Sequence, residues 1–144
     1  MIHLGIDPGK LGGLTLLADD GTVIDSVKMP ATDGDLLDLF HEWSTESIPC
    51  ATLEFVRSSP QMGVVSAFTF GMGYGGLKMA LLASGIPFET VTPAKWQGAL
   101  RCRTKGDKNV TKRKAQELWP ARKWTHAIAD SALIAEWGRR ARNG

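Results

Sequence analysis

The chain contains little cysteine and no long apolar run, and both features exclude whole classes of protein. Its two cysteines, Cys50 and Cys102, are too far apart for a zinc finger, and they are too few for a small secreted domain that is stabilised by disulfide bonds. The N-terminus has no basic region followed by an apolar stretch, and no segment is long enough to span a membrane. We therefore expect a cytoplasmic protein with two reduced thiols.

Length and composition predict one globular domain over residues 1–144. The chain is 43% hydrophobic and 22% charged, which is ordinary for a soluble protein. A chain of 144 residues can bury a core without disulfides or structural metals. The sequence contains no internal repeat and no low-complexity segment.

Charge is distributed unevenly along the chain. Residues 1–93 carry four Lys or Arg against eleven Asp or Glu, whereas residues 94–144 carry thirteen against four. The net charge of +2 therefore combines an acidic half with a basic half. A basic stretch is typical of proteins that bind a polyanion such as nucleic acid, and the alternative is a solvated helical surface.

Hydrophobic periodicity predicts alternating strands and helices. Strands are expected over residues 2–7, 14–17, 23–29, 51–56 and 88–91, and helices over residues 33–43, 64–84, 93–100, 109–118 and 126–140. Asp33 or Asp35 is expected to cap the first helix, and glycines at 71–76 to interrupt the second. This order predicts an α/β fold with a five-stranded mixed sheet and helices on both faces. Three strands form an antiparallel meander, two run parallel, and the first strand is central.

Three acidic residues lie within apolar patterns of three different elements. Asp7 ends the first strand, Glu54 lies in the fourth, and Asp130 lies in the last helix. A carboxylate removed from water is costly unless it is paired, protonated or bound to a cation. The three together suggest a divalent metal site for phosphate chemistry, with Asp7 bridging two ions. Taken singly, each could instead be a cap, an ion-pair partner or a surface residue.

The last helix places a histidine on the stripe that contains Asp130. Positions 126, 130, 133, 134 and 137 follow helical spacing, so we expect His126 and Asp130 to share the face that packs on the sheet. A neutral imidazole at His126 could replace one oxygen ligand of the metal site. The alternative is a structural histidine in the core or at the start of the helix.

Five motifs are spread along nearly the whole chain. They are Gly-Ile-Asp-Pro-Gly at 5–9, Leu-Glu-Phe-Val at 53–56, the stretch 60–71 with Tyr74 and Gly75, Val-Thr-Pro at 91–93 with Trp96, and the stretch 129–136. In combination and in this order they resemble the RuvC family of Holliday junction resolvases, and particularly its shorter phage and prophage members.

The resemblance implies a ribonuclease H-like fold and a homodimeric endonuclease of DNA recombination and repair. Such an enzyme resolves four-way junctions by paired symmetric nicks that leave 5′-phosphates, and it uses two Mg²⁺ ions per active site. By motif position, Asp7, Glu54 and Asp130 are catalytic metal ligands. The fourth ligand precedes the last aspartate, and we assign it to His126, although Ala127 has the spacing of three. An imidazole ligand also suits Mn²⁺ as a substitute.

The resemblance also implies a DNA-binding surface and a dimer. The candidate DNA-binding residues are Arg57, Gln61, Lys105, Lys108 and Lys112. Lys108 and Lys112 are four apart and could face one phosphate backbone, or both could simply be solvated. We expect at least two of the aromatic residues Phe68, Phe70 and Tyr74 to lie in the core rather than stack on bases. The expected dimer surface is the helix around residues 68–82.

Three other functions remain open on the sequence. One is a ribonuclease H-like nuclease that acts on RNA–DNA hybrids, pre-ribosomal RNA or other branched DNA. The second is an actin-like ATPase or sugar kinase, because residues 5–9 also resemble their phosphate loop, but such proteins need two domains of this kind. The third is a non-catalytic junction-binding protein, which a buried cluster of carboxylates makes less favourable. We expect a cytoplasmic protein of a bacterial cell, encoded by the host or by a phage, with no membrane partner and no nucleotide cofactor.

Overall fold

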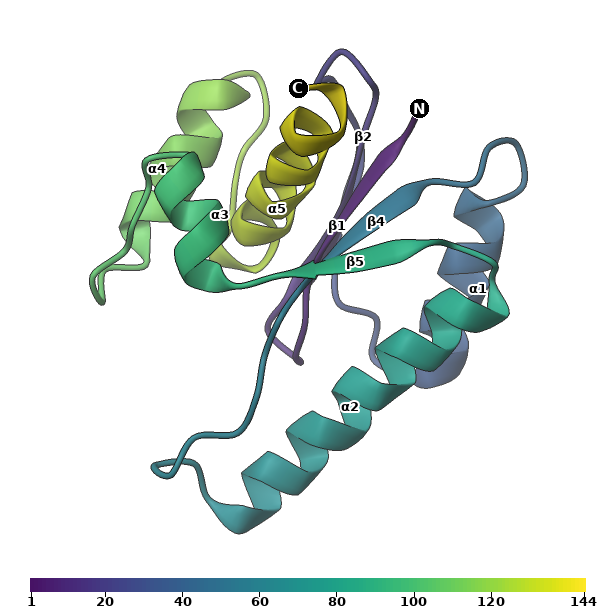
Figure 1. Ribbon diagram of the computed structural model, residues 1–144, viewed down its shortest axis with the longest axis vertical. Coiled ribbons are helices and arrows are strands. Elements are labelled where there is room, and N and C mark those ends of the chain that lie inside the picture. Colours follow the sequence, from purple (N-terminus) through teal and green to yellow (C-terminus); the bar gives the residue numbers. More distant parts are fainter.

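The sheet has the predicted five strands in the order β3-β2-β1-β4-β5, with β1 at its centre. The computed structural model describes all residues, 1–144 (Figure 1). The first three strands form an antiparallel meander, and β4 and β5 run parallel to β1. The strands are β1 (His3–Asp7), β2 (Gly13–Leu17), β3 (Val23–Lys28), β4 (Cys50–Glu54) and β5 (Phe88–Val91).

Helices cover both faces of this sheet, as the sequence predicts (Figure 1). On one face, α1 (Asp33–Trp43) and α2 (Val64–Ala83) pack on a core that includes Leu4, Ile6 and Leu14. The other face carries α3 (Pro93–Ala99), α4 (Asn109–Leu118) and α5 (His126–Asn143). Side chains alternate between the faces of a strand, so β1 is buried on both sides.

The most extensive helix–sheet contact is that of α5 with β1 and β2. Gly5 of β1 lies against α5 so closely that a Cβ there would overlap the carbonyl oxygen of Ser131. A Cβ at Gly13 of β2 would likewise overlap the carbonyl oxygen of Ala127. The Ser131 hydroxyl also hydrogen-bonds to that of Thr15 on β2, with 2.8 Å between the oxygens. Two glycines on adjacent strands, both turned toward α5, therefore let this helix lie directly on the sheet backbone.

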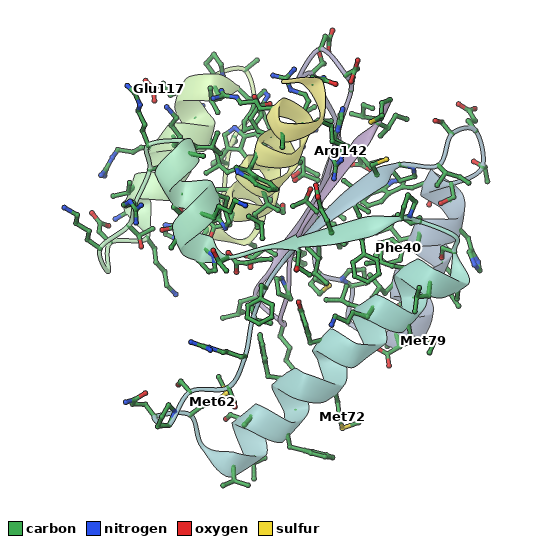
Figure 2. All side chains as sticks on the ribbon, in the orientation of Figure 1. Phe40, Met62, Met72, Met79, Glu117 and Arg142 are labelled. Atoms are coloured by element: carbon green, nitrogen blue, oxygen red, sulfur yellow. The ribbon has the colours of Figure 1, made fainter.

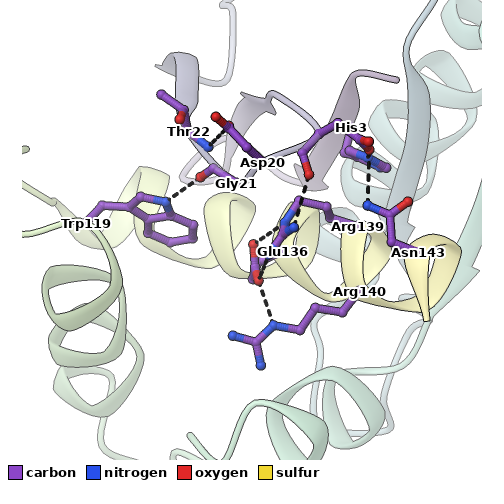
Figure 3. Close-up of polar contacts among 10 residues, drawn as sticks. His3, Asp20, Gly21, Thr22, Trp119, Glu136, Arg139, Arg140 and Asn143 are labelled. Carbon is purple, nitrogen blue, oxygen red and sulfur yellow. Dashed lines mark hydrogen bonds and ion pairs between the residues drawn. The ribbon is translucent and has the colours of Figure 1, made fainter.

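The C-terminal half of α5 is tied to the sheet by charged side chains. Glu136 accepts hydrogen bonds from Arg139 and Arg140, and Arg139 also donates to the backbone carbonyl of Asp19 (Figure 3). Arg142 donates to Nδ1 of the fully buried His3, at 3.0 Å. These contacts hold the helix in one register along β1.

Helix α2 departs from the predictions in two ways. It is continuous from Val64 to Ala83, so the predicted interruption at residues 71–76 is wrong. The prediction that at least two of its three aromatic residues are core residues is also wrong. Phe68 is 69% exposed, and Phe70 and Tyr74 are half-buried. The reason is that α2 extends past the sheet, and its buried residues all lie in its C-terminal half (Figure 1).

Two smaller features complete the comparison with the predictions. Thr32 caps α1, because its hydroxyl oxygen accepts from the Asp35 amide at 3.1 Å, so the predicted caps Asp33 and Asp35 are wrong. Among the helices, none combines the length and the apolar character that a crossing of the lipid bilayer requires.

Replacement of Gly5 tests the close packing of α5. We expect Gly5→Ala to lower the free energy of unfolding by about 3 kcal/mol or more, because the new methyl overlaps backbone atoms of α5. Gly75→Ala is the matched control, since nothing lies within 4 Å of that position on α2. It should raise stability by about 0.5–1 kcal/mol, because alanine favours a helix over glycine. Urea unfolding measures both changes, and equal stability of the two variants would contradict this packing.

Candidate functional site

Asp7 and Glu54 lie side by side where two parallel strands end. The register of β1 and β4 pairs Ile6 with Leu53, so the next residue on each strand is a carboxylate. Both side chains are half-buried. The carboxyl ends of neighbouring parallel strands meet at one edge of a sheet, and this is a common position for ligand-binding groups.

Asp130 joins them from α5, the helix that covers the face of the sheet shared by Gly5, Asp7 and Gly13. It lies one residue before Ser131 on α5, whose backbone rests on Gly5 of β1. Asp130 is half-buried, and it is near enough to both strand carboxylates to act on their charge. The structure therefore brings together the three acidic residues predicted from the sequence, although they are as many as 123 positions apart in a chain of 144.

The three carboxyl groups hold their protons unusually tightly. Burial raises the pKa of Asp7 to about 8, with further increases from the nearby Glu54 and Asp130 charges and an opposing effect of Lys108. Burial also raises the pKa of Glu54 to about 7, opposed by a hydrogen bond from Trp96. The pKa of Asp130 is raised by burial, and Thr111, His126 and Lys108 oppose this. Burial and mutual repulsion of this kind mark a site that lacks positive charge.

His126 does not join the carboxylates in this arrangement. It begins α5 but is exposed, and its Nε2 lies 3.0 Å from the Asn109 side-chain oxygen at the start of α4. The expectation that His126 packs on the sheet with Asp130 is therefore wrong. The first turn of α5 does lie on the sheet, at Gly13, but the His126 side chain turns to α4 instead, and burial on its stripe becomes complete at Leu133 and Ile134. His126 is nevertheless near enough to lower the pKa of Asp130.

The donor set matches a hard divalent cation in kind, because it consists of carboxylates with unneutralised charge. However, nowhere in the chain do three or more His, Cys, Asp or Glu side chains converge closely enough to hold one ion. A cation at this site would therefore have to draw Asp7, Glu54 and Asp130 inward. His126 would have to leave Asn109 before it could serve as a fourth ligand.

Sequence reasoning missed two residues that contact this site. Trp96 of α3 donates its indole N–H to Glu54 Oε2 at 2.7 Å. Thr111 of α4 is buried, its hydroxyl donates to the Lys108 carbonyl oxygen at 3.2 Å, and it is near enough to Asp130 to lower the pKa of that carboxyl group. The sequence contained one signal for Trp96, since Pro93 begins a helix directly after the strand that borders Glu54, which places Trp96 in the first turn. We find no comparable sequence signal for Thr111.

The candidate DNA-binding residues lie on α4 and in loops, and one of them, Lys108, is close to the carboxylates. Lys108, at the start of α4, is near enough to lower the pKa of Asp7 and of Asp130. Lys112 is half-exposed and lines an open groove of about 290 Å³ together with Asn109, Arg113 and Gln116. Nitrogen-tipped side chains are numerous around α3 and α4 (Figure 2). The lysine nearest to the acidic site is therefore Lys108, and Lys112 lies one turn further along α4.

The remaining candidates lie in loops. Arg57 is exposed three residues after Glu54 and lines an open groove of about 370 Å³ between this segment and α2. Phe68, Phe70 and Tyr74 form the α2 side of that groove. Gln61 and Lys105 are exposed, and Lys105 has a positive φ of 47°.

Solved structures share this fold over its full length. One is described as Thermus thermophilus RuvC in complex with Holliday junction substrate. It has a TM-score of 0.73 at 19% identity, and the match covers 100% of this chain and 97% of that one. A second Thermus thermophilus RuvC structure has a TM-score of 0.71 at 20% identity, with the same coverage. No family model matches the sequence, and no curated protein matches it either. The chain therefore has the ribonuclease H-like fold of RuvC, which confirms at the level of fold the resemblance seen in its motifs.

Proposed function

We propose that residues 1–144 form one RuvC-family nuclease domain that resolves four-way DNA junctions by paired symmetric nicks. The observation that carries the proposal is the convergence of Asp7, Glu54 and Asp130 at one edge of a RuvC-like sheet. Their raised pKa values support a site that needs positive charge to stabilise its ionised form. The reaction is hydrolysis of a phosphodiester bond, which leaves a 5′-phosphate and a 3′-hydroxyl.

In this proposal, Asp7, Glu54 and Asp130 hold Mg²⁺, and His126 is the fourth ligand once it leaves Asn109. Two divalent ions, with Mn²⁺ as a substitute for Mg²⁺, supply Lewis-acid stabilisation and lower the pKa of water at such sites. The chain itself supplies orientation and partial exclusion of water. Burial limits the access of water to Asp7 and Glu54, and α5 covers the face of the sheet on which they lie.

Binding of DNA would use the basic side chains next to these carboxylates. Lys108 and Lys112 lie on the first turns of α4, and Arg57, Gln61 and Lys105 lie in flanking loops. Lysines bind phosphates mainly through charge, so they would hold the backbone without reading sequence. The Lys108 charge would also screen the repulsion between the DNA and the carboxylates.

We further propose a homodimer, because a symmetric junction presents two equivalent strands. The support is the apolar surface of α2 that this chain leaves exposed. Met72 and Met79 lie on the side of α2 turned away from the sheet (Figure 2). Val64 is 87% and Val65 80% exposed at the start of the same helix. An apolar helix face of this extent is typical of a protein–protein contact.

Loss of one strand carboxylate should abolish cleavage but retain binding. We expect Asp7→Asn to cut a labelled mobile junction at below about one-hundredth of the wild-type rate with Mg²⁺ or Mn²⁺. Loss of a metal ligand should reduce activity at least as much as loss of a side chain that only orients a ligand. Gel-shift affinity for the junction in a metal chelator should stay similar. Asp38→Asn, on the exposed side of α1, is the control and should cut normally.

Cleavage and binding assays on several substrates distinguish the candidate activities. Retained cutting by Asp7→Asn would contradict the site. Faster cleavage of RNA–DNA hybrids or flaps than of junctions would favour another ribonuclease H-like nuclease. Junction binding without cleavage by the wild-type protein would favour a non-catalytic binding protein.

The raised pKa values predict that the metal-free protein loses stability as pH rises. Asp7 has a native pKa of about 8 against 3.8 for the unfolded chain, and Glu54 about 7 against 4.5. Between these limits the native state binds more protons than the unfolded chain, so the free energy of unfolding falls with rising pH. Urea unfolding between about pH 5 and about pH 9 should show this fall.

Two changes should reverse that loss at the alkaline end. Asp7→Asn removes the costly charge and should be more stable than wild type near pH 8 in a metal chelator. Mg²⁺ should stabilise the wild type there, because it binds the native site and not the unfolded chain. Stability that is flat or rises across this range would contradict the buried carboxylates.

Lys112 should contribute to DNA affinity through charge alone. We expect Lys112→Ala to weaken junction binding and to reduce the slope of log affinity against log salt concentration by about one. Arg140→Ala, in the last turn of α5 and ten residues beyond Asp130, removes one positive charge at the other end of that helix and is the control. Fluorescence anisotropy over a salt series measures both slopes, and equal slopes would indicate a lysine that is only solvated.

A further inference from the structure

Trp96 makes a contact with the candidate site that is unusual for a buried tryptophan. Its ring is fully buried, and its Nε1–H donates to Glu54 Oε2 over 2.7 Å. No other hydrogen bond reaches the Glu54 side chain, so Oε1 has no donor from the protein. The indole therefore holds one carboxylate oxygen and leaves the other available.

The other buried indole groups show what a purely structural tryptophan does in this chain. Trp119 donates to the backbone carbonyl of Gly21 at 2.8 Å, and Trp124 donates to that of Trp119 at 3.1 Å. A neutral carbonyl satisfies a buried N–H group at no electrostatic cost. Of the five tryptophans, only Trp96 donates to an ionisable side chain.

The backbone leading to Trp96 determines where its indole lies. Val91 of β5 pairs with Glu54 of β4, so the two strands end together. Thr92 then caps α3 and Pro93 occupies its first turn, which starts the helix directly beside Glu54. Trp96 is the fourth residue of that helix, and its side chain turns back toward the strand ends.

The packing around Trp96 limits its freedom to move. Its ring belongs to an apolar cluster shared by β5, α3 and α5, the helix that carries Asp130. The buried members of this cluster are Val91, Trp96, Leu100, Cys102, Leu133 and Ile134. A ring held on several sides presents its N–H in one direction.

We propose that Trp96 is a positioning residue, which orients the Glu54 carboxylate so that Oε1 faces the cation. This proposal rests on the proposed metal-dependent function. An indole suits the task because it can donate one hydrogen bond and cannot accept one, so it does not compete with Glu54 as a ligand. Outer partners that orient a metal-binding side chain commonly contribute to affinity.

The first test removes the N–H group and keeps an aromatic ring. Trp96→Phe should weaken Mn²⁺ binding by about 10- to 100-fold, as measured from the paramagnetic resonance signal of free Mn²⁺. Trp137→Phe is the matched control, because Trp137 packs against the same apolar cluster but makes no hydrogen bond to Glu54. Its Mn²⁺ affinity should equal that of the wild type.

The second test needs no substitution at Trp96, so it does not depend on whether Trp96→Phe folds. The indole N–H resonance of Trp96 in the wild-type protein should shift on addition of Mg²⁺. It should also shift in Glu54→Gln, because a neutral amide oxygen is a weaker acceptor than a carboxylate. The other four indole resonances serve as internal controls and should move much less.

The outcomes separate this proposal from the proposed function. Two results overturn the positioning role even if the wild type cleaves junctions. One is an unchanged Mn²⁺ affinity in Trp96→Phe, and the other is a Trp96 indole resonance that shifts neither with Mg²⁺ nor in Glu54→Gln. Mn²⁺ binding with the expected Trp96 responses, but without junction cleavage, supports the positioning role and overturns the nuclease. A wild-type protein that binds no Mn²⁺ overturns both.

Discussion

The candidate site depends on the contact between α5 and the glycines of β1 and β2. Gly5 and Gly13 leave the sheet backbone bare, so the helix lies close enough for Asp130 to act on the charge of Asp7. Side chains at either glycine would lift the helix and carry Asp130 away. Hydrogen bonds from Arg139 to the Asp19 carbonyl and from Arg142 to His3, at the far end of α5, then keep the helix from sliding along the strand. The close packing of the α5 backbone on the sheet is therefore what brings the mutually repelling carboxylates together.

The sheet was predictable because its pattern is local. Apolar residues alternate with small or polar ones in β1, and short turns separate the first three strands, so order and direction follow from the sequence. Helix α2 was mispredicted because its glycines and apolar residues fit two explanations. A run of glycine suggests a break, and aromatic residues at helical spacing suggest a core. The tertiary arrangement overrides both, since α2 extends beyond the sheet that would have buried Phe68 and Phe70.

The site was predictable as a set of carboxylates but not as a geometry. Asp7, Glu54 and Asp130 were identified because charged residues in apolar elements require an explanation. The orientation of His126 depends on Asn109, which belongs to another helix, and no periodicity of α5 contains that information. Trp96 could be recognised only as part of a motif, because a tryptophan in a sequence does not reveal which acceptor its N–H group meets. Partners of side chains are decided by tertiary contacts rather than by spacing.

The charge asymmetry of the chain gains a physical meaning from this arrangement. The acidic half supplies Asp7 and Glu54, and the basic half supplies Asp130 together with the lysines at the start of α4. Lys108 is near enough to act on Asp7 and Asp130 while its side chain remains exposed to solvent. A fully neutralised cluster would bind cations weakly, and an unscreened one would repel DNA. An exposed lysine beside half-buried acids attracts a phosphate backbone while it leaves the carboxylates short of positive charge, and this balance suits a site that must gather both a polyanion and divalent cations.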